Sequence, residues 1–248
     1  MTAVLYARSG AVVRITLNRP SVLNAADEAW VADLNACADR AAADPDARVV
    51  VVEGQGRAFC TGIDVTALAA GRIGREWFAA WERAMRALET MDRLVVAAVH
   101  GYCIGGGLQV ALACDVRVAR DDAILGLPAV KEGLIPGLGT WRLPRFVGLG
   151  RAKRMILTGE TIGAQEALAI GLVDHVATAD RFAAEVERVA NALSGVAFAS
   201  AIESKRLTNM AFEPHAPVLA AYLDGQERAM TSPEHARVMA EWRARKAR

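Results

Sequence analysis

Hydrophobic and polar positions in the first hundred residues follow the periods of short strands and amphipathic helices. Apolar runs at residues 4–7 and 12–17 are typical of strands, and the Ser9-Gly10 pair between them predicts a hairpin. The runs at residues 48–53, with four consecutive valines, and 94–99 are continuous rather than alternating. Continuous apolar runs of this length predict strands that are buried on both faces.

The residues between these predicted strands have the spacing of helices. Asp27 is a plausible N-cap for a helix that continues to Ala43, before the Asp44-Pro45-Asp46 turn. Aromatic and aliphatic residues recur every three or four positions over residues 75–91, which predicts an amphipathic helix. A further apolar helix is expected at residues 108–114.

In the second half of the chain, predicted strands give way to predicted helices. Short strands are expected at residues 116–119 and 124–127, and beyond Gly148 helical spacing continues almost to the end. Strands and helices in alternation, followed by helices alone, predict an α/β core at residues 1–180 and a helical region at residues 181–248.

The composition of the chain argues against several classes of protein. The formal net charge is +1, so a nucleic-acid-binding surface is not expected, and 53% hydrophobic residues are ample for a buried core. The longest uninterrupted apolar stretch, residues 94–99, is too short to cross a membrane. The first ten residues lack the apolar segment of a secretory signal. We therefore expect a cytoplasmic protein.

Several familiar catalytic and cofactor motifs are missing from the sequence. The four cysteines form no C-x-x-C pair, and the four histidines are scattered, so neither a disulfide framework nor a metal site is expected. Glycine pairs such as Gly54/Gly56 lack the third glycine of a dinucleotide fingerprint, and no P-loop, nucleophile elbow or zinc-protease motif occurs. Chemistry must therefore depend on backbone groups and carboxylates.

Two segments combine a strand end, a small-residue turn and a helix start: residues 54–64 and residues 99–109, with three consecutive glycines in the second. Helix N-termini leave backbone N–H groups unpaired, and glycines let a ligand approach the backbone closely. Two such turns directed at one point would form an oxyanion hole. Each segment alone is also compatible with an ordinary tight α/β connection.

Several separated motifs, in order, resemble the crotonase superfamily, the enoyl-CoA hydratase/isomerase family. They cover nearly the whole chain and include Leu17-Asn18-Arg19-Pro20, Asn24-Ala25, residues 58–64, residues 101–107, Cys114-Asp115-Val116-Arg117 and residues 133–137. The resemblance implies a crotonase-like spiral of ββα units with a C-terminal α-helical trimerisation region. It also implies an acyl-CoA thioester as substrate, no cofactor, and a homotrimer or a hexamer made of two trimers.

The same resemblance assigns roles to individual residues. The backbone N–H groups of Ile63 and Gly106 match the family's two donors to the thioester oxygen. The neighbouring motif positions are implied to bind substrate: Ala25, Cys60, Thr61, Gly62, Asp64, Gly105 and Ala129. For Asp64, a helix N-cap role is the competing interpretation.

The sequence departs from the family at the two acid positions. Hydratases of the family carry glutamates where this chain has Gln109 and Ala129, and neither residue transfers a proton as a carboxylate does. Gln109 can still orient a water molecule or a substrate group. Glu132 lies one helical turn after Ala129, so we expect it to reach the same pocket as acid or base, with burial raising its pKa. A surface pair of Lys131 and Glu132 is the alternative.

Three further features have both a functional and a structural interpretation. His100 precedes the glycine segment, where packing of the turn is favoured over catalysis. The aromatic residues of the 75–91 helix either shape an acyl site or pack the core; they are Trp77, Phe78 and Trp81. Basic residues near the C-terminus resemble those that approach CoA phosphates in relatives, or form a solvated end; they accompany Trp242 and are Arg243, Arg245 and Lys246.

Two hypotheses about function remain open. The first is an acyl-CoA-processing enzyme, a hydratase or isomerase that stabilises a thioester enolate. The second is a non-catalytic acyl-CoA-binding protein that has lost the two glutamates. A peptidase of related fold is disfavoured, because no serine or lysine occurs in a motif at the pocket segments.

Overall fold

The computed structural model describes residues 2–212 together with Pro233 and Arg237. The chain divides into two compact units, residues 1–190 and 191–248. The helices, with two 3₁₀ turns labelled η, are η1 (Pro20–Val22), α1 (Glu28–Ala43), α2 (Val65–Ala69), α3 (Arg75–Thr90), α4 (Gly106–Leu112), η2 (Pro128–Glu132), α5 (Gly139–Thr158), α6 (Ala164–Ala169), α7 (Phe182–Ser194) and α8 (Phe198–Asn209).

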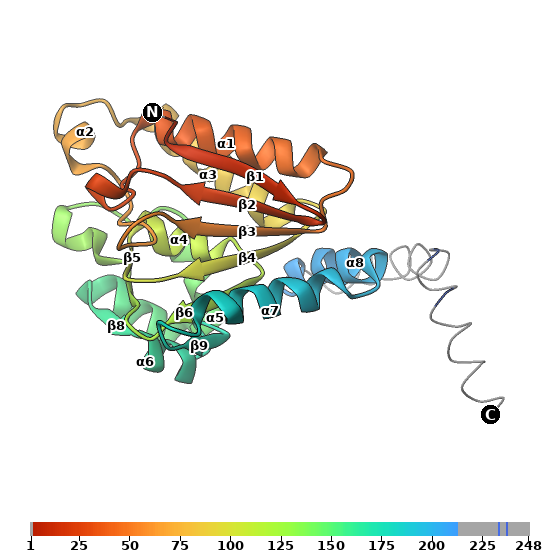
Figure 1. Ribbon diagram of the computed structural model, residues 1–248. Helices are drawn as coiled ribbons and strands as arrows, with labels where there is room; N and C mark the ends of the chain where they lie inside the picture. Colours follow the sequence, from red (N-terminus) through yellow and green to blue (C-terminus); the bar gives the residue numbers. More distant parts are fainter. Residues whose placement is uncertain (1, 213–232, 234–236, 238–248) are drawn as a thin grey trace. The chain divides into compact units, whose positions relative to one another are not determined.

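A six-stranded sheet organises the first unit within the described residues. Its order is β1-β2-β3-β4-β6-β9, and its strands are β1 (Val4–Ser9), β2 (Val12–Leu17), β3 (Val49–Gly54), β4 (Leu94–Val99), β6 (Val116–Arg120) and β9 (His175–Ala177). The β1–β2 hairpin is antiparallel, and every later pair is parallel. Figure 1 shows β1 to β4 side by side. The predicted hairpin is confirmed.

A smaller three-stranded sheet lies at the ends of the main strands. Its order is β5-β7-β8, with β5 (Tyr102–Ile104), β7 (Ile124–Gly126) and β8 (Thr161–Gly163). Two strands precede a helix three times along the chain: β1-β2 before α1, β4-β5 before α4, and β6-β7 before η2 and α5. This succession is the repeated ββα unit that the resemblance implies.

Burial explains the choice of residues in the central strands. Residues 49–52 of β3 and all of β4 are buried, as continuous valine-rich runs require when helices or loops cover both faces of a parallel sheet. Helices α1 and α3 pack against one another, and their buried side chains join those of β1 and β2 in one core. The Asp27 carboxylate accepts the N–H of Trp30, so the predicted N-cap of α1 is confirmed.

Two expectations about secondary structure are wrong in detail. Helix α4 begins at Gly106, two residues before the predicted start, because the glycines themselves form its first turn. Strands β8 and β9 lie in the stretch where helical spacing was expected beyond Gly148. Each has only three residues, too few for a period of two to stand out from a period of 3.6.

Helices α7 and α8 occur in the C-terminal stretch that was predicted to be helical. The basic positions near the C-terminus lie outside the described residues; they are Arg243, Arg245 and Lys246, next to Trp242. Within the described residues, no helix combines the length and the apolar character that a membrane span requires.

Candidate active site

The loop after β3 is held by a buried amide. Asn24 is fully buried, and its Nδ2 donates to the carbonyl oxygens of Gln55, Ala58 and Phe59 at 2.9–3.1 Å. Asn24 itself has a positive φ of 58°, a conformation that asparagine tolerates better than most residues. One side chain therefore fixes the path of the chain from β3 toward Ile63. In the sequence, Asn24 stands out only as part of a motif, and the motif does not indicate this role.

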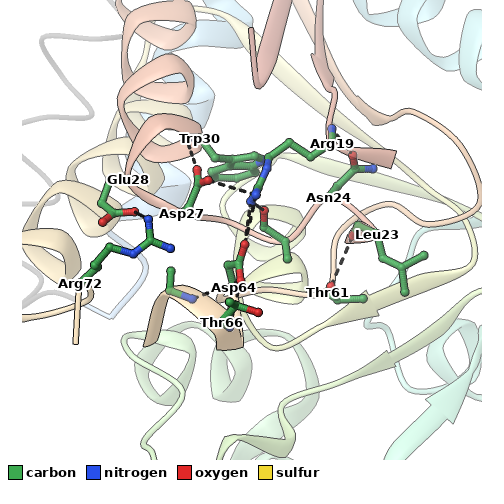
Figure 2. Close-up of polar contacts among 12 residues, drawn as sticks. Arg19, Leu23, Asn24, Asp27, Glu28, Trp30, Thr61, Asp64, Thr66 and Arg72 are labelled. Atoms are coloured by element: carbon green, nitrogen blue, oxygen red, sulfur yellow. Dashed lines mark hydrogen bonds and ion pairs between the residues drawn. The ribbon is translucent and has the colours of Figure 1, made fainter. Parts of the chain in front are cut away.

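An arginine links the caps of two helices on either side of the same loop. Figure 2 shows the guanidinium of Arg19 between the carboxylates of Asp27 and Asp64, each at 3.1 Å. Asp64 also accepts the backbone N–H groups of Thr66 and Ala67, at 3.0 and 3.3 Å, and thereby caps α2. Burial alone would raise the pKa of Asp64, but these N–H groups and Arg19 lower it. The N-cap interpretation of Asp64 is confirmed.

The backbone around Ile63 is oriented by a short parallel bridge to Ala26. The N–H of Ala26 donates to the oxygen of Gly62 at 2.7 Å, and the N–H of Asp64 donates to the oxygen of Ala26 at 2.9 Å. Since successive backbone groups of an extended chain point to opposite sides, the N–H of Ile63 faces away from Ala26. Among the described residues, no backbone oxygen accepts this N–H.

The glycine turn before α4 meets this loop directly. Gly105 adopts φ 57° and ψ −117°, which a side chain would disfavour, and α4 begins at Gly106. A methyl group on Gly106 would lie 3.0 Å from the Cα of Gly62, and one on Gly62 would reach the backbone nitrogen of Gly106. The N–H of Gly106 has no backbone acceptor among the described residues. The two segments singled out in the sequence are thus in contact.

A cavity of about 470 Å³ opens beside this contact. Of the predicted site residues, seven line it: Thr61, Ile63, Gly105, Gly106, Gln109, Ala129 and Glu132. The other four do not line it: Ala25, Cys60, Gly62 and Asp64. These four contact residues of the loop itself: the oxygen of Ala25 and the carboxylate of Asp64 bind Arg19, Sγ of Cys60 binds the oxygen of Asn24, and Gly62 lies against Gly106. Their contact with substrate stays a prediction.

Cys60 illustrates this structural role. Its side chain is fully buried, with Sγ 3.2 Å from the oxygen of Asn24 and 3.3 Å from the nitrogen of Gly62. Burial raises the pKa of the Cys60 thiol to about 12. Such a thiol is not ionised at neutral pH and therefore is no nucleophile.

The acid position predicted from the sequence lies at the mouth of the cavity. Pro128–Glu132 forms a 3₁₀ helix, so Ala129 and Glu132 share one face and both line the cavity, as expected. The side chain of Glu132 is exposed, however. The burial that the sequence led us to expect for this carboxylate is therefore absent.

Gln109 lies deeper in the same cavity. It is buried on α4, and its Oε1 has no hydrogen-bond partner among the described residues. A methyl group on Gly137 would meet this oxygen at 2.9 Å, and one on Gly139 would lie 3.2 Å from its Cγ. The start of α5 therefore closes over the amide.

The cavity contains a further carboxylate that the sequence pattern did not indicate, that of Glu82 on α3. Its Oε2 pairs with Nη1 of Arg142 at 2.9 Å, and its Oε1 accepts the N–H of Leu138 at 3.2 Å. The available signal was a single acid, one residue after Trp81, beside the apolar face of a helix. Within the described residues, no cluster of three His, Cys, Asp or Glu side chains is placed to hold a metal.

Aromatic rings form one wall of the cavity. Trp81 stacks on Trp30 and on Trp77, with centroids 5.4 and 5.3 Å apart, and Phe78 meets Trp77 edge to face. Trp77 and Trp81 are buried, yet both line the cavity with Phe78. The packing and cavity-lining interpretations of these residues therefore both hold.

His100 lies away from this cavity. It is buried, with Nε2 3.0 Å from the oxygen of Gly56 and its ring against Phe182. Burial lowers its pKa. The structural interpretation of His100 as packing of the turn is confirmed.

Comparison with known proteins agrees with the geometry. The family model described as "Enoyl-CoA hydratase/isomerase" matches residues 7–240. A probable enoyl-CoA hydratase of Mycobacterium bovis is 36% identical over 215 residues, 85% of this chain and 82% of that protein. The (E)-benzylidenesuccinyl-CoA hydratase of Thauera aromatica is 40% identical over 196 residues, 74% of this chain and 75% of that protein. The crystal structure of an enoyl-CoA hydratase from Bacillus anthracis superposes with a TM-score of 0.92 at 28% identity, covering 98% of this chain and 96% of that one. The predicted crotonase-like α/β fold is thereby confirmed.

Proposed function

The chain belongs to the enoyl-CoA hydratase/isomerase family, and from this premise we propose that it binds the carbonyl oxygen of an acyl-CoA thioester through the backbone N–H groups of Ile63 and Gly106. The reaction is hydration of a 2-enoyl thioester, its reverse, or shift of the double bond. It requires no metal or redox cofactor. The single observation that carries the proposal is the contact, beside a cavity, of two loops whose N–H groups at Ile63 and Gly106 have no backbone acceptor in the part of the chain that the structure describes.

The chemistry follows from where negative charge develops. Carbons next to a thioester become reactive when the carbonyl oxygen carries charge as an enolate. Preorganised backbone donors cost no reorganisation at that moment, and removal of one such donor typically costs about 3 kcal/mol of barrier. Because the donors are main-chain groups, the side chain of Ile63 is free to line the cavity.

The cavity wall favours an apolar acyl group that contains a ring. Phe78 is the exposed member of the aromatic wall, and Ile135 and Leu138 add apolar surface to the cavity lining. Aromatic groups pack well in offset or edge-to-face arrangements against such rings. A relative named for a benzylidenesuccinyl thioester supports this choice.

A carboxylate in the cavity must move the proton. Glu132 is the candidate that the sequence supplies, with Gln109 orienting a water molecule or a substrate group. Replacement of the two family glutamates by Gln109 and Ala129 is the observation that favours the second function, acyl-CoA binding without turnover.

One experiment separates these functions. Purified protein is assayed with 2-enoyl-CoAs and 3-enoyl-CoAs of short, long and aryl-substituted chains, and binding of the saturated analogues is measured by calorimetry. Turnover of any of these thioesters supports the enzyme. Tight binding with no turnover supports the binding protein, and absence of both refutes the proposed function.

We also propose a cytoplasmic homotrimer or a hexamer of two trimers, as the family resemblance implies. Large apolar side chains on the surface of α5 support self-association, since Leu149 and Leu157 are 61% and 70% exposed. Sedimentation equilibrium tests it, and a monomer at micromolar concentration refutes it.

A further inference from the structure

Gln109 presents a buried acceptor that nothing in the described chain satisfies. The residue is 6% exposed, it lines the cavity, and its Oε1 has no donor among the described residues. Buried polar side-chain atoms are hydrogen-bonded in the large majority of cases, so each exception requires an explanation. A donor that arrives with the substrate is one such explanation.

A second acceptor borders the same space. A methyl group on Gly137 would lie 2.9 Å from Oε1 of Gln109 and 3.3 Å from Oε1 of Glu82. The two oxygens therefore lie close to each other where α3 and α4 meet the segment before α5. Two neighbouring acceptors can be bridged by a molecule with two donors, and water is the smallest such molecule.

The carboxylate of Glu82 is held in place by a buried arginine. Arg142 is 2% exposed, and its Nη1 binds Oε2 of Glu82 at 2.9 Å. Oε1 accepts one hydrogen bond, from the N–H of Leu138, and keeps a second lone pair for a ligand. The Glu82 side chain is 24% exposed, whereas Glu132 is an exposed residue at the rim. Glu82 is therefore the cavity carboxylate with a fixed orientation.

We propose that Glu82 is the catalytic residue that transfers the proton in this cavity, and that Glu82 and Gln109 together hold the reacting water. Arg142 is a positioning residue that acts through Glu82. This inference rests on the proposed function, because it supplies the group that acts opposite the thioester oxygen.

The step balances with one water and one carboxylate. The water oxygen bonds to C3 of a 2-enoyl thioester while its proton passes to Oε1 of Glu82. The electron pair of the C2–C3 double bond moves toward the carbonyl, and the oxygen held by Ile63 and Gly106 takes the charge. Glu82 then returns the proton to C2, the carbonyl re-forms, and the carboxylate is regenerated.

The test compares carboxylates on the same helix. Glu82→Gln is expected to lower kcat for hydration about 100-fold or more with little change in KM, because it removes general acid–base catalysis. Glu89→Gln is the matched control: Glu89 also pairs with Arg142, at 3.5 Å, but does not line the cavity. Its kcat should stay within about twofold of the wild-type value.

The pH profile separates catalysis from a structural effect. As the base, Glu82 must be ionised, so kcat/KM of the wild type should fall on the acid side as the carboxylate is protonated. This limb should persist in Glu89→Gln, persist with a reduced rate in Glu82→Asp, and vanish in Glu82→Gln. Loss of the limb in Glu132→Gln instead, with Glu82→Gln active, overturns the inference in favour of Glu132.

A second variant keeps the test decisive if Glu82→Gln fails to fold. Gln109→Leu retains every carboxylate and removes the amide that shares the water with Glu82 in a side chain of similar size. It should lower kcat strongly while calorimetric binding of a saturated acyl-CoA is unchanged. Wild-type kcat in Gln109→Leu, or in a folded Glu82→Gln, refutes the inference alone. A wild-type protein that turns over no thioester refutes the proposed function, and the inference with it.

Discussion

The substitution Gly106→Ala tests how tightly the aromatic wall is coupled to the proposed oxyanion hole. Gly106 does not adopt a positive φ, so alanine is compatible with its backbone. Its methyl group, however, would lie 2.8 and 2.9 Å from two ring carbons of Trp81 and 3.0 Å from the Cα of Gly62. Ordinary carbon–carbon contacts are about 3.5–4.0 Å, so either the ring or the backbone must shift by roughly 0.7 Å.

The ring has little freedom to shift. Trp81 is buried and stacked between Trp30 and Trp77 with interplanar angles of 15° and 16°. Overpacking of this kind typically costs about 1–3 kcal/mol of unfolding free energy. If the backbone shifts instead, the N–H of Gly106 moves out of position. Loss of one such donor lowers kcat about 100- to 1,000-fold.

Urea unfolding and steady-state kinetics of Gly106→Ala measure the two effects, and Trp81→Phe supplies the partner for a double-mutant cycle. A smaller ring leaves room for the methyl group, so the double variant Gly106→Ala/Trp81→Phe should be less destabilised than the two single effects added together. Full activity and full stability of Gly106→Ala would refute the reasoning, since they would require a space that the packing does not contain.

Three other predictions concern the loop behind the site. Asn24→Ala leaves three carbonyl oxygens without their donor, so we expect a loss of about 2–4 kcal/mol in urea unfolding, and a loss below about 0.5 kcal/mol would contradict the role of the amide. Asp64 has a lowered pKa, so it stabilises the fold above its unfolded pKa of about 3.9, and this contribution disappears as the pH falls through the lower folded value. Asp64→Asn should therefore be less stable at pH 7, with the difference from wild type shrinking at pH 3–4; a difference independent of pH would contradict this linkage. Cys60, with a pKa of about 12, should not react with a thiol reagent at pH 8 until urea unfolds the protein, and rapid labelling of the native protein would refute its burial.

Much of the candidate site was predictable because its chemistry is local. The segments 54–64 and 99–109 were recognised as strand-to-helix turns from a few adjacent residues. The contact between Gly62 and Gly106 brings the two turns together as expected. The roles of Asn24 and Arg19 were not predictable from spacing. Each acts on backbone or carboxylate groups more than thirty residues further along the chain, including Asp64.

The two carboxylates of the cavity show the same difference between what neighbouring residues predict and what tertiary packing decides. Glu132 was found because it shares a turn with Ala129, but its exposure depends on the position of η2 at the cavity rim. Glu82 was missed because it enters the cavity only through the approach of α3 to the start of α5, where Arg142 and Leu138 bind it.

The amino-acid order alone determined the strands and helices of the core, the two glycine-containing turns and the family, since periodicity, capping and motifs are encoded within a few turns of chain. Tertiary structure decided which of these residues share a cavity. Long-range packing sets the distances between side chains on different elements, and those distances decide which acid faces Gln109 and which faces solvent.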